Sequence, residues 1–312
     1  MKMVSLGNTG VEVSEFCLGT MHFGSKEDKL ISYQLLDQFA EAGGNFLDTA
    51  NIYAHWTPNG AGGDSELLLG EWMRDRKNRD QMFIASKVGF EYQDVPRGLP
   101  ANRIEEECNK SLMRLGVETI DLYYAHVDDR NTPLEETLAA FDKLVKAGKV
   151  RLIGASNYLA WRLEEARWLS KNNDWAEYCC VQQRYTYARP KPGASFDPQI
   201  SANDDLLDYC ANRDTTLLAY SPLLAGAYAN RPDRTFPDQY ASADTDARFA
   251  LLKAVAEEAN ATPNQVILTW MGQNSIIPLV AGSTIAQMEE NLKAVDVKLT
   301  DDQMERLDAA SG

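Results

Sequence analysis

The stretch NFLDTANIY, residues 45–53, decides how the fold of this chain is read. Its first three residues predict a short strand, the acid Asp48 stands at the exit of that strand, and Tyr53 follows five residues later. A buried carboxylate is costly without a partner, and two later strand ends, in IASKVG and DLYYAHVDD, supply Lys87 and His126. A tyrosine, a lysine, an aspartate and a histidine that meet at one edge of a sheet can deliver a proton to a carbonyl oxygen. The stretch therefore predicts half of a carbonyl reduction, for which a hydride donor would supply the other half.

Eight short apolar runs along the chain predict strands. They cover residues 15–18, 45–47, 82–86, 120–125, 150–156, 178–182, 215–221 and 276–282. Most of these runs are continuously apolar, as in parallel strands that are buried on both faces. The segments between them carry apolar residues at helical spacing, for example from Ile104, from Leu134 and from Phe249 onward. Eight strand–helix units in 312 residues predict a (β/α)8 TIM barrel.

The helix starts and the first turns support a single barrel domain over residues 1–312. Thr132-Pro133 and Thr262-Pro263 each predict a capping residue followed by proline at the first helical position. A doubly wound sheet is the alternative, but it normally has a GxGxxG turn after its first strand, where this chain reads CLGTMHFG. The opening residues 3–16 alternate apolar and polar side chains around Asn8-Thr9-Gly10, which predicts a hairpin that closes the N-terminal end of the barrel.

The composition excludes several classes of partner. The chain has 46 acidic and 31 basic residues and a net charge of −15, so nucleic acids and anionic membranes are poor candidates. Its five cysteines include no CxxC pair, which argues against a disulfide framework and against a cysteine zinc site. There is neither an apolar secretory segment at the N-terminus nor a run of 18 apolar residues, so we expect a cytoplasmic protein with a small-molecule substrate. The composition does not predict the oligomeric state.

Polar residues follow the predicted strands, at the face where barrel active sites lie. These residues are Gly19, Asp48, Lys87, His126, Ser156, Asn157, Gln182, Tyr220 and Gly282. The chain resembles the aldo-keto reductase superfamily over nearly its whole length. The resemblance is carried, in order, by LGT, FLDTANIY, SKVG, YYAHVDD, IGASNY, VQQRY, AYSPLLAG and GSTIAQMEEN.

The resemblance implies a catalytic tetrad of Asp48, Tyr53, Lys87 and His126, with Tyr53 as the proton donor. A free tyrosine has a pKa near about 10, and the ammonium of Lys87 is expected to lower the pKa of Tyr53. Asp48 would pair with Lys87 and offset the burial of its charge. His126 would position the substrate carbonyl.

The resemblance also implies a nicotinamide cofactor that supplies the hydride. Ser156, Asn157 and Gln182 would bind the carboxamide, and Tyr220 would stack on the ring. The other cofactor-binding residues that it implies are Gly19, Thr20, Asp48, Ser221, Leu223, Gly226, Gly282, Ser283, Gln287, Glu290 and Asn291. Residues 221–248 are expected to form a long loop over the cofactor. NADP(H) is the expected cofactor, and NAD(H) stays open because no Lys or Arg stands between Pro278 and Glu290 to hold a 2′-phosphate.

The substrate pocket is expected to be aromatic, with the loop of residues 54–65 choosing the substrate. Its expected lining residues are Phe23, His55, Trp56, Tyr92 and Arg130. Flat aromatic side chains with polar edges suit a sugar or an aromatic aldehyde. Two alternatives remain. One is a cofactor-binding regulatory subunit of a larger complex with little turnover; the other is a metal-dependent barrel enzyme using Asp48, His126 and Asp128, although no metal site is expected because the chain has no HxH or HExxH pair.

Overall fold

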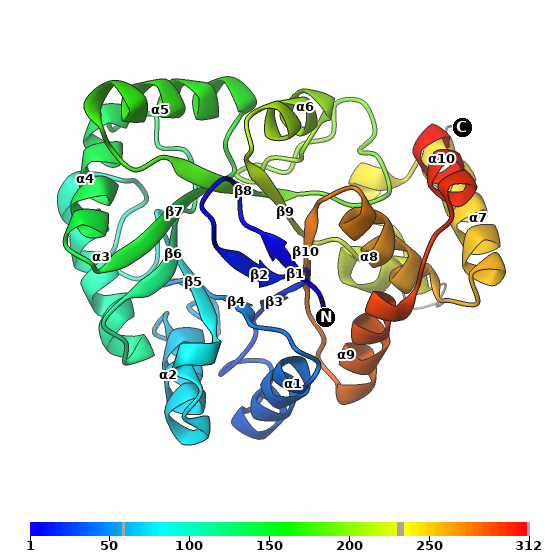
Figure 1. Cartoon of the computed structure of the whole chain (residues 1–312), viewed down its shortest axis with the longest axis horizontal. Coiled ribbons are helices and arrows are strands. Elements are labelled where there is room, and N and C mark those ends of the chain that lie inside the picture. Colours follow the sequence, from blue (N-terminus) through cyan, green and yellow to red (C-terminus); the bar gives the residue numbers. More distant parts are fainter. Residues whose placement is uncertain (58–59, 230–233, 311–312) are drawn as a thin grey trace.

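Eight parallel strands form a closed barrel in the computed structural model, which describes residues 1–57, 60–229 and 234–310. Helices surround the barrel (Figure 1). The strands are β3 (Cys17–Gly19), β4 (Phe46–Asp48), β5 (Phe83–Val88), β6 (Ile120–Ala125), β7 (Val150–Ser156), β8 (Tyr178–Arg184), β9 (Thr216–Tyr220) and β10 (Ile277–Val280). They follow one another in chain order around the barrel, and β10 closes it by pairing with both β9 and β3. The (β/α)8 prediction and the eight predicted strands are confirmed.

The helices follow the predicted periodicity, with one error at a helix start. They are α1 (Lys29–Glu41), α2 (Asp64–Arg76), α3 (Ala101–Leu115), α4 (Leu134–Lys146), α5 (Ala160–Asn173), α6 (Asp204–Asn212), α7 (Ala243–Glu258), α8 (Pro263–Gln273), α9 (Ile285–Leu292) and α10 (Asp301–Ala309). The start of α8 is as predicted, because Thr262 caps it in a capping box and Pro263 is its first residue. The start of α4 is wrong by one residue, because Pro133 is itself the N-cap and has an extended ψ of 132°.

The predicted hairpin is confirmed, and it closes the floor of the barrel. Strands β1 (Met3–Ser5) and β2 (Glu12–Ser14) pair antiparallel, and they lie across the centre of the view in Figure 1. Leu6 and Val13 are fully buried in one cluster with side chains from inside the barrel, including Phe46 and Phe83. The backbone N–H of Gly7 donates to the hydroxyl of Thr216, at the start of β9, over 2.7 Å.

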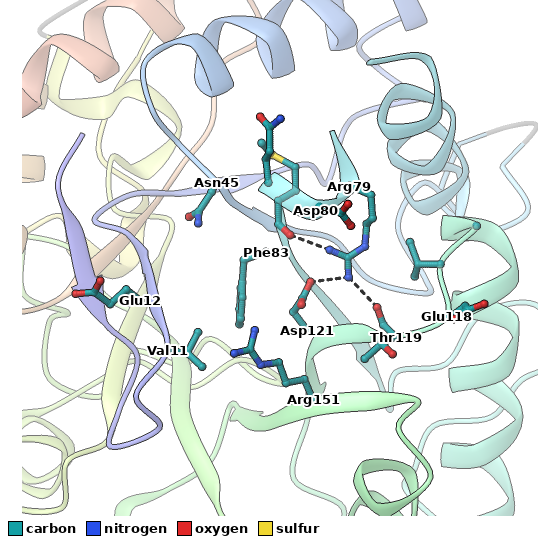
Figure 2. A pocket seen from close by; sticks show the side chains of 14 residues that line it. Val11, Glu12, Asn45, Arg79, Asp80, Phe83, Glu118, Thr119, Asp121 and Arg151 are labelled. Carbon is teal, nitrogen blue, oxygen red and sulfur yellow. Dashed lines mark hydrogen bonds and ion pairs between the residues drawn. The ribbon is translucent and has the colours of Figure 1, made fainter. Parts of the chain in front are cut away.

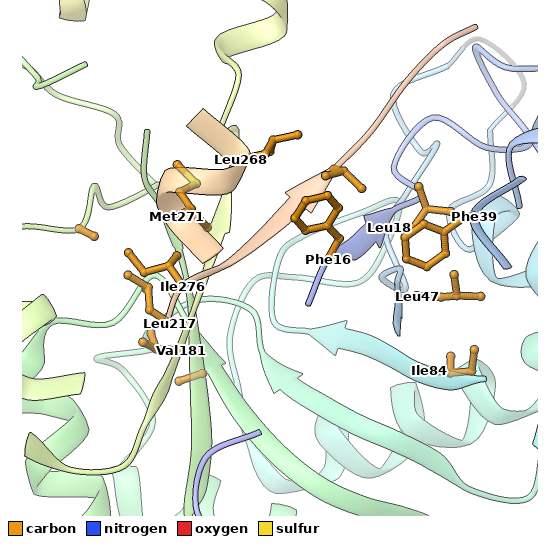
Figure 3. Packing of buried hydrophobic residues seen from close by; sticks show 14 of the residues in the cluster. Phe16, Leu18, Phe39, Leu47, Ile84, Val181, Leu217, Leu268, Met271 and Ile276 are labelled. Carbon is orange, nitrogen blue, oxygen red and sulfur yellow. The ribbon is translucent and has the colours of Figure 1, made fainter. Parts of the chain in front are cut away.

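The main core lies between the barrel and its helices. Figure 3 shows side chains from three adjacent strands, Leu18, Leu47 and Ile84, and places Phe39 of α1 beside this group. All four are fully buried members of one cluster. Because side chains alternate along a strand, these outward residues leave their neighbours in the chain pointing into the barrel.

The segment 221–248 is more ordered than a single loop. It contains the 3-10 helices η2 (Leu224–Ala229) and η3 (Asp238–Tyr240), and its last six residues already belong to α7. Ser242 caps α7 through its side chain, which the apolar pattern did not reveal. Residues 230–233 of this segment lie outside the described residues. Across the ranges that the structure describes, no helix is both long and apolar enough to span a membrane.

Candidate active site

The polar side chains of the site continue the inward-facing rows of the barrel strands. On β6, Leu122 and Tyr124 point into the barrel, and His126 follows at the next alternate position. On β4, Phe46 and Asp48 are alternate residues in the same way, so both point into the barrel. On β5, Phe83 and Ala85 precede Lys87 in the same way. Since the strands are parallel, these last inward positions meet at their carboxyl ends, where barrel active sites form.

Lys87 joins the three groups at the centre of the site. Its ammonium donates to Asp48 Oδ2 over 2.5 Å, to the carbonyl of Thr49 over 2.8 Å and to the hydroxyl of Tyr53 over 2.8 Å. The side chains of Lys87 and Asp48 are 0% and 1% exposed. The hydroxyl of Thr20 donates to the carbonyl of Asp48 over 2.9 Å, which fixes the end of β4.

The electrostatics of this group combine the expected effect of Lys87 on Tyr53 with a larger effect of burial. Burial raises the pKa of Tyr53, and although Lys87 lowers it, the net pKa lies above the ordinary value. The expected lowering by Lys87 is therefore present, but desolvation has the larger effect. Burial also raises the pKa of Asp48 despite its bonds to Lys87 and Gln182. Burial lowers the pKa of Lys87, but Asp48 and Tyr53 together raise it by more. The net pKa of Lys87 therefore lies above its ordinary value, and the ammonium form is favoured.

His126 lies beside Tyr53 and is held in its neutral form. The centroids of the two rings are 6.2 Å apart. Burial and the charge of Lys87 lower the pKa of His126 well below its ordinary value. Its Nδ1 is buried without a hydrogen-bond partner among the described residues. In that part of the chain, no group of three or more His, Cys, Asp or Glu side chains is arranged to hold a metal.

Two of the three expected carboxamide-binding residues have free hydrogen-bonding capacity. The amide nitrogen of Gln182 donates to Asp48 Oδ1 over 2.7 Å, and its oxygen accepts no bond from any described residue. The oxygen of Ser156 accepts from Asn157 over 3.2 Å, and its hydroxyl hydrogen likewise has no described acceptor. One free acceptor and one free donor match the two halves of a carboxamide.

Asn157, by contrast, is engaged within the protein. Its nitrogen donates to the carbonyl of His126 over 2.9 Å and to Ser156. Its oxygen accepts from the hydroxyl of Tyr220 over 2.8 Å and from the backbone N–H of Ile200 over 3.2 Å. Asn157 also has a positive φ of 59°, in the left-handed region that asparagine tolerates better than most residues. These bonds tie together the ends of β6, β7 and β9.

The expected adenosine end surrounds the start of α9. The oxygen of Gln287 accepts from the backbone N–H of Ser283 over 2.8 Å. Glu290 accepts from the hydroxyl of Thr262 over 2.7 Å, and the amide of Asn291 donates to a backbone carbonyl over 3.0 Å. Glu290 and Asn291 therefore brace α9 in this structure. The remaining expected cofactor residues at the mouth are Gly19, Ser221, Leu223, Gly226 and Gly282; a side chain added at Gly226 would meet nothing within 4 Å.

Two aromatic rings stand beside the site, Trp56 next to Tyr53 and Phe90 next to His126. Trp56 is 45% exposed, and its ring centroid lies 6.1 Å from that of Tyr53 and 5.3 Å from that of His55. On the other side, Phe90 meets the ring of His126 edge-on at 4.7 Å. Phe90 was not predicted as a site residue, although it directly follows the motif SKVG at the end of a strand and could have been chosen on that ground.

The other residues expected around the substrate have partners of their own. Phe23 is 3% exposed and packs in the main core. Tyr92 is 6% exposed, and its hydroxyl donates to Glu107 over 2.5 Å. Arg130 forms an ion pair with Asp128 at the rim.

A groove of about 580 Å³ lies at the opposite end of the barrel from this chemistry. Figure 2 shows Arg79 there, bonded to Asp121 near the start of β6. Val11 and Glu12 of the hairpin also line this groove. Neither the tetrad nor any of the expected cofactor residues does so.

Comparison with known proteins identifies the family. The sequence profile of the Aldo/keto reductase family matches residues 15–311. The chain is an aldo-keto reductase. Members of this family reduce carbonyl compounds with a nicotinamide cofactor, so the predicted class of enzyme and cofactor is confirmed at that level.

Individual relatives agree with this family. The chain is 34% identical to the aldo-keto reductase str7 of Strobilurus tenacellus, over 94% of this chain and 87% of that protein. It is 29% identical to the aryl-alcohol dehydrogenase [NADP(+)] of Phanerodontia chrysosporium, over 96% of this chain and 82% of that protein. The solved structure of a thermostable aldo-keto reductase, Tm1743, bound to the inhibitor epalrestat, matches with a TM-score of 0.79 and 28% identity over all of both chains.

Proposed function

We propose that this aldo-keto reductase catalyses the NADP(H)-dependent interconversion of an aldehyde, ketone or sugar carbonyl with its alcohol, with Tyr53 as the proton donor. The observation that carries the proposal is the hydroxyl of Tyr53, 2.8 Å from the buried ammonium of Lys87. A proton donor beside a cation can release its proton as charge develops on the oxygen, without further reorganisation of the site. Asp48 keeps Lys87 charged and aimed at that hydroxyl.

His126 takes a binding role in this proposal. Since its pKa is held well below the ordinary value, the ring is neutral near pH 7 and cannot compete with Tyr53 as a cationic acid. A neutral imidazole can still donate one hydrogen bond to a carbonyl oxygen. The carbonyl would then lie between the Tyr53 hydroxyl and His126.

The residues present fit a nicotinamide. The free oxygen of Gln182 and the free hydroxyl hydrogen of Ser156 complement a carboxamide. Tyr220, whose hydroxyl is fixed by Asn157, offers its ring for stacking. The bound cofactor would supply the hydride, and the chain's own residues would fix which ring face meets the carbonyl.

NADP(H) is proposed ahead of NAD(H), because the relative from Phanerodontia chrysosporium is named for NADP(+). The preference is expected to be weaker than where a cation holds the 2′-phosphate, since the start of α9 has none. For the substrate, we favour a flat aromatic carbonyl compound. The same relative is named for aryl alcohols, and the exposed Trp56 and the ring of Phe90 flank Tyr53 and His126.

Steady-state turnover tests this proposal. A panel of aromatic, aliphatic and sugar carbonyl compounds is assayed with NADPH and with NADH, followed by the reverse reaction. We expect turnover that is fastest with aromatic aldehydes and NADPH. Tight cofactor binding without turnover on any of them would instead identify a regulatory subunit.

A further inference from the structure

One buried acid outside the tetrad, Glu107 of α3, accepts more hydrogen bonds than its place on a surface helix requires. It is 1% exposed. Its Oε2 accepts from the side-chain nitrogen of Asn51 over 2.7 Å and from the hydroxyl of Tyr92 over 2.5 Å. Its Oε1 accepts from Lys110 over 2.7 Å, and Lys110 is partly exposed. A carboxylate is buried this fully only where its bonds offset the lost hydration.

Asn51 links this acid to the loop of the proton donor. It stands two residues before Tyr53 in the chain and is fully buried. Its backbone N–H donates to the carbonyl of Lys87 over 3.3 Å, so its main chain is bonded to the strand that carries the catalytic ammonium. The side-chain bond to Glu107 fixes the same residue from the outer side.

Tyr92 links the acid to the other end of that loop. A side chain at Gly62 would come within 2.7 Å of the Tyr92 ring, so the ring lies directly against the backbone there. The next residue, Gly63, donates its backbone N–H to the carbonyl of Tyr53 over 3.1 Å. Tyr53 and Trp56 lie between Asn51 and Gly62 in the chain.

We propose that Glu107 is a positioning residue for the reaction, which fixes Asn51 directly and the backbone at Gly62 through Tyr92, and thereby holds Tyr53 against Lys87. In this role Tyr92 transmits the hydrogen bond of Glu107 to the backbone at Gly62, and it makes no selective contact with substrate. The inference rests on the proposed role of Tyr53.

Removal of the carboxylate would leave two buried donors, those of Asn51 and Tyr92, without their acceptor, and would free the backbone around Tyr53 to shift. A displacement of about 1 Å at a reacting group can lower a rate by about 100-fold. Because the misplaced group is the proton donor, kcat should fall for small and large substrates alike. The cofactor is bound by other elements, so its affinity should not change.

The test compares Glu107→Ala with Glu107→Gln. We expect Glu107→Ala to lower kcat by about 10- to 100-fold with an unchanged Kd for NADPH. The amide oxygen of glutamine can still accept from Asn51 and Tyr92, while Lys110 can turn to solvent, so Glu107→Gln should restore most of kcat. Hydrogen exchange at the backbone amides of Asn51 and Gly63 should be faster in Glu107→Ala and near normal in Glu107→Gln.

A matched control comes from the far end of the barrel. Asp121 is also a buried carboxylate, 9% exposed, and it accepts from the backbone N–H of Ile84 over 2.9 Å. It also pairs with Arg79 over 2.8 Å, as Figure 2 shows. Asp121→Asn should lower the resistance of the protein to urea and leave kcat unchanged. If Glu107 acts only on stability, Glu107→Ala will behave in the same way, and the proposal is overturned.

Further outcomes separate this inference from the role of Tyr53. An equal loss of kcat in Glu107→Ala and Glu107→Gln would overturn the positioning role of Glu107. Unchanged hydrogen exchange at the backbone amides of Asn51 and Gly63 would overturn it as well. If Glu107→Ala does not fold, Tyr92→Phe removes a single donor and should lower kcat equally for small and bulky aldehydes. An effect of Tyr92→Phe confined to KM for bulky substrates would show substrate contact and also overturn it. Failure of Tyr53 as proton donor would instead appear as retained turnover in Tyr53→Phe, with the exchange results unaltered.

Discussion

Lys87 acts on Tyr53 against the effect of burial. Desolvation of the phenol raises the pKa of Tyr53, and the ammonium at 2.8 Å lowers it. In the proposed reaction the protonated Tyr53 gives the proton, so the rate of reduction should fall as pH rises through the pKa of Tyr53. Loss of Lys87 removes the lowering effect, which moves that fall to higher pH.

We therefore expect Lys87→Met to shift the alkaline limb of the pH–rate profile upward by about 1–3 units, or beyond the measurable range. Turnover should also drop, because Asp48 loses its partner. The measurement is kcat against pH, with Lys143→Met as the control, since Lys143 forms an exposed pair with Glu105. A limb that stays at the pH of the unaltered protein would contradict this role of Lys87.

Single residues were predictable where the strand pattern alone determines their direction. Asp48, Lys87 and His126 follow from alternation along parallel strands that end at one face. The partners of Tyr92 and Asn157 were not predictable, because they come from other elements, α3 and the loop near Ile200, which only the tertiary fold brings into contact. The net pKa of Tyr53 also depends on how much surrounding chain excludes water, which one sequence motif does not reveal.

At the scale of elements, the loop after β4 is the clearest candidate for substrate choice. It brings the half-exposed Trp56 within 6.1 Å of the Tyr53 ring. Residues 58–59 of this loop lie outside the described residues. A tryptophan face can hold a flat substrate through contact area.

Trp56→Ala should raise KM for a bulky aromatic aldehyde by about tenfold, from about 1–2 kcal/mol of lost contact. Small aldehydes should be nearly unaffected. The control is Trp168→Ala, which removes a 63% exposed tryptophan from α5. Steady-state kinetics on both substrates decides the matter: an equal loss on small and bulky aldehydes would show that Trp56 supports Tyr53 and does not select substrate.

Elements with strong apolar patterns were predictable, and irregular ones were not. The eight strands are marked by their own side chains. The segment 221–248 was read as one loop from its glycines and prolines, but tertiary packing buries Tyr228 and Tyr240 in 3-10 turns. Local composition does not report such packing.

At the scale of the whole molecule, the N-terminal hairpin packs closely against the floor of the barrel at Gly7. Gly7 has a positive φ of 53°, and a side chain there would lie 2.4 Å from the carbonyl oxygen of Cys179. Gly10 has a positive φ of 71° in the same hairpin, with nothing within 4 Å of an added side chain. A comparison of substitutions at Gly7 and Gly10 therefore distinguishes the effect of backbone strain from the effect of close packing.

We expect Gly7→Ala to destabilise the protein by about 1–3 kcal/mol more than Gly10→Ala, because both variants carry the strain of positive φ and only Gly7→Ala overpacks the floor. Urea midpoints measure the difference. Since the active site lies at the other end of the strands, kcat should be unchanged in the folded fraction of both. Equal midpoints would show that the hairpin is not held tightly against the barrel.

The central claim, that Tyr53 is the proton donor, is tested most directly by Tyr53→Phe, which keeps the ring and removes only the hydroxyl. A positioned acid contributes about 10²–10⁴-fold. The account predicts that kcat for aldehyde reduction falls by at least about 100-fold while the Kd for NADPH, measured by fluorescence titration, stays the same. Turnover near that of the unaltered protein would contradict it.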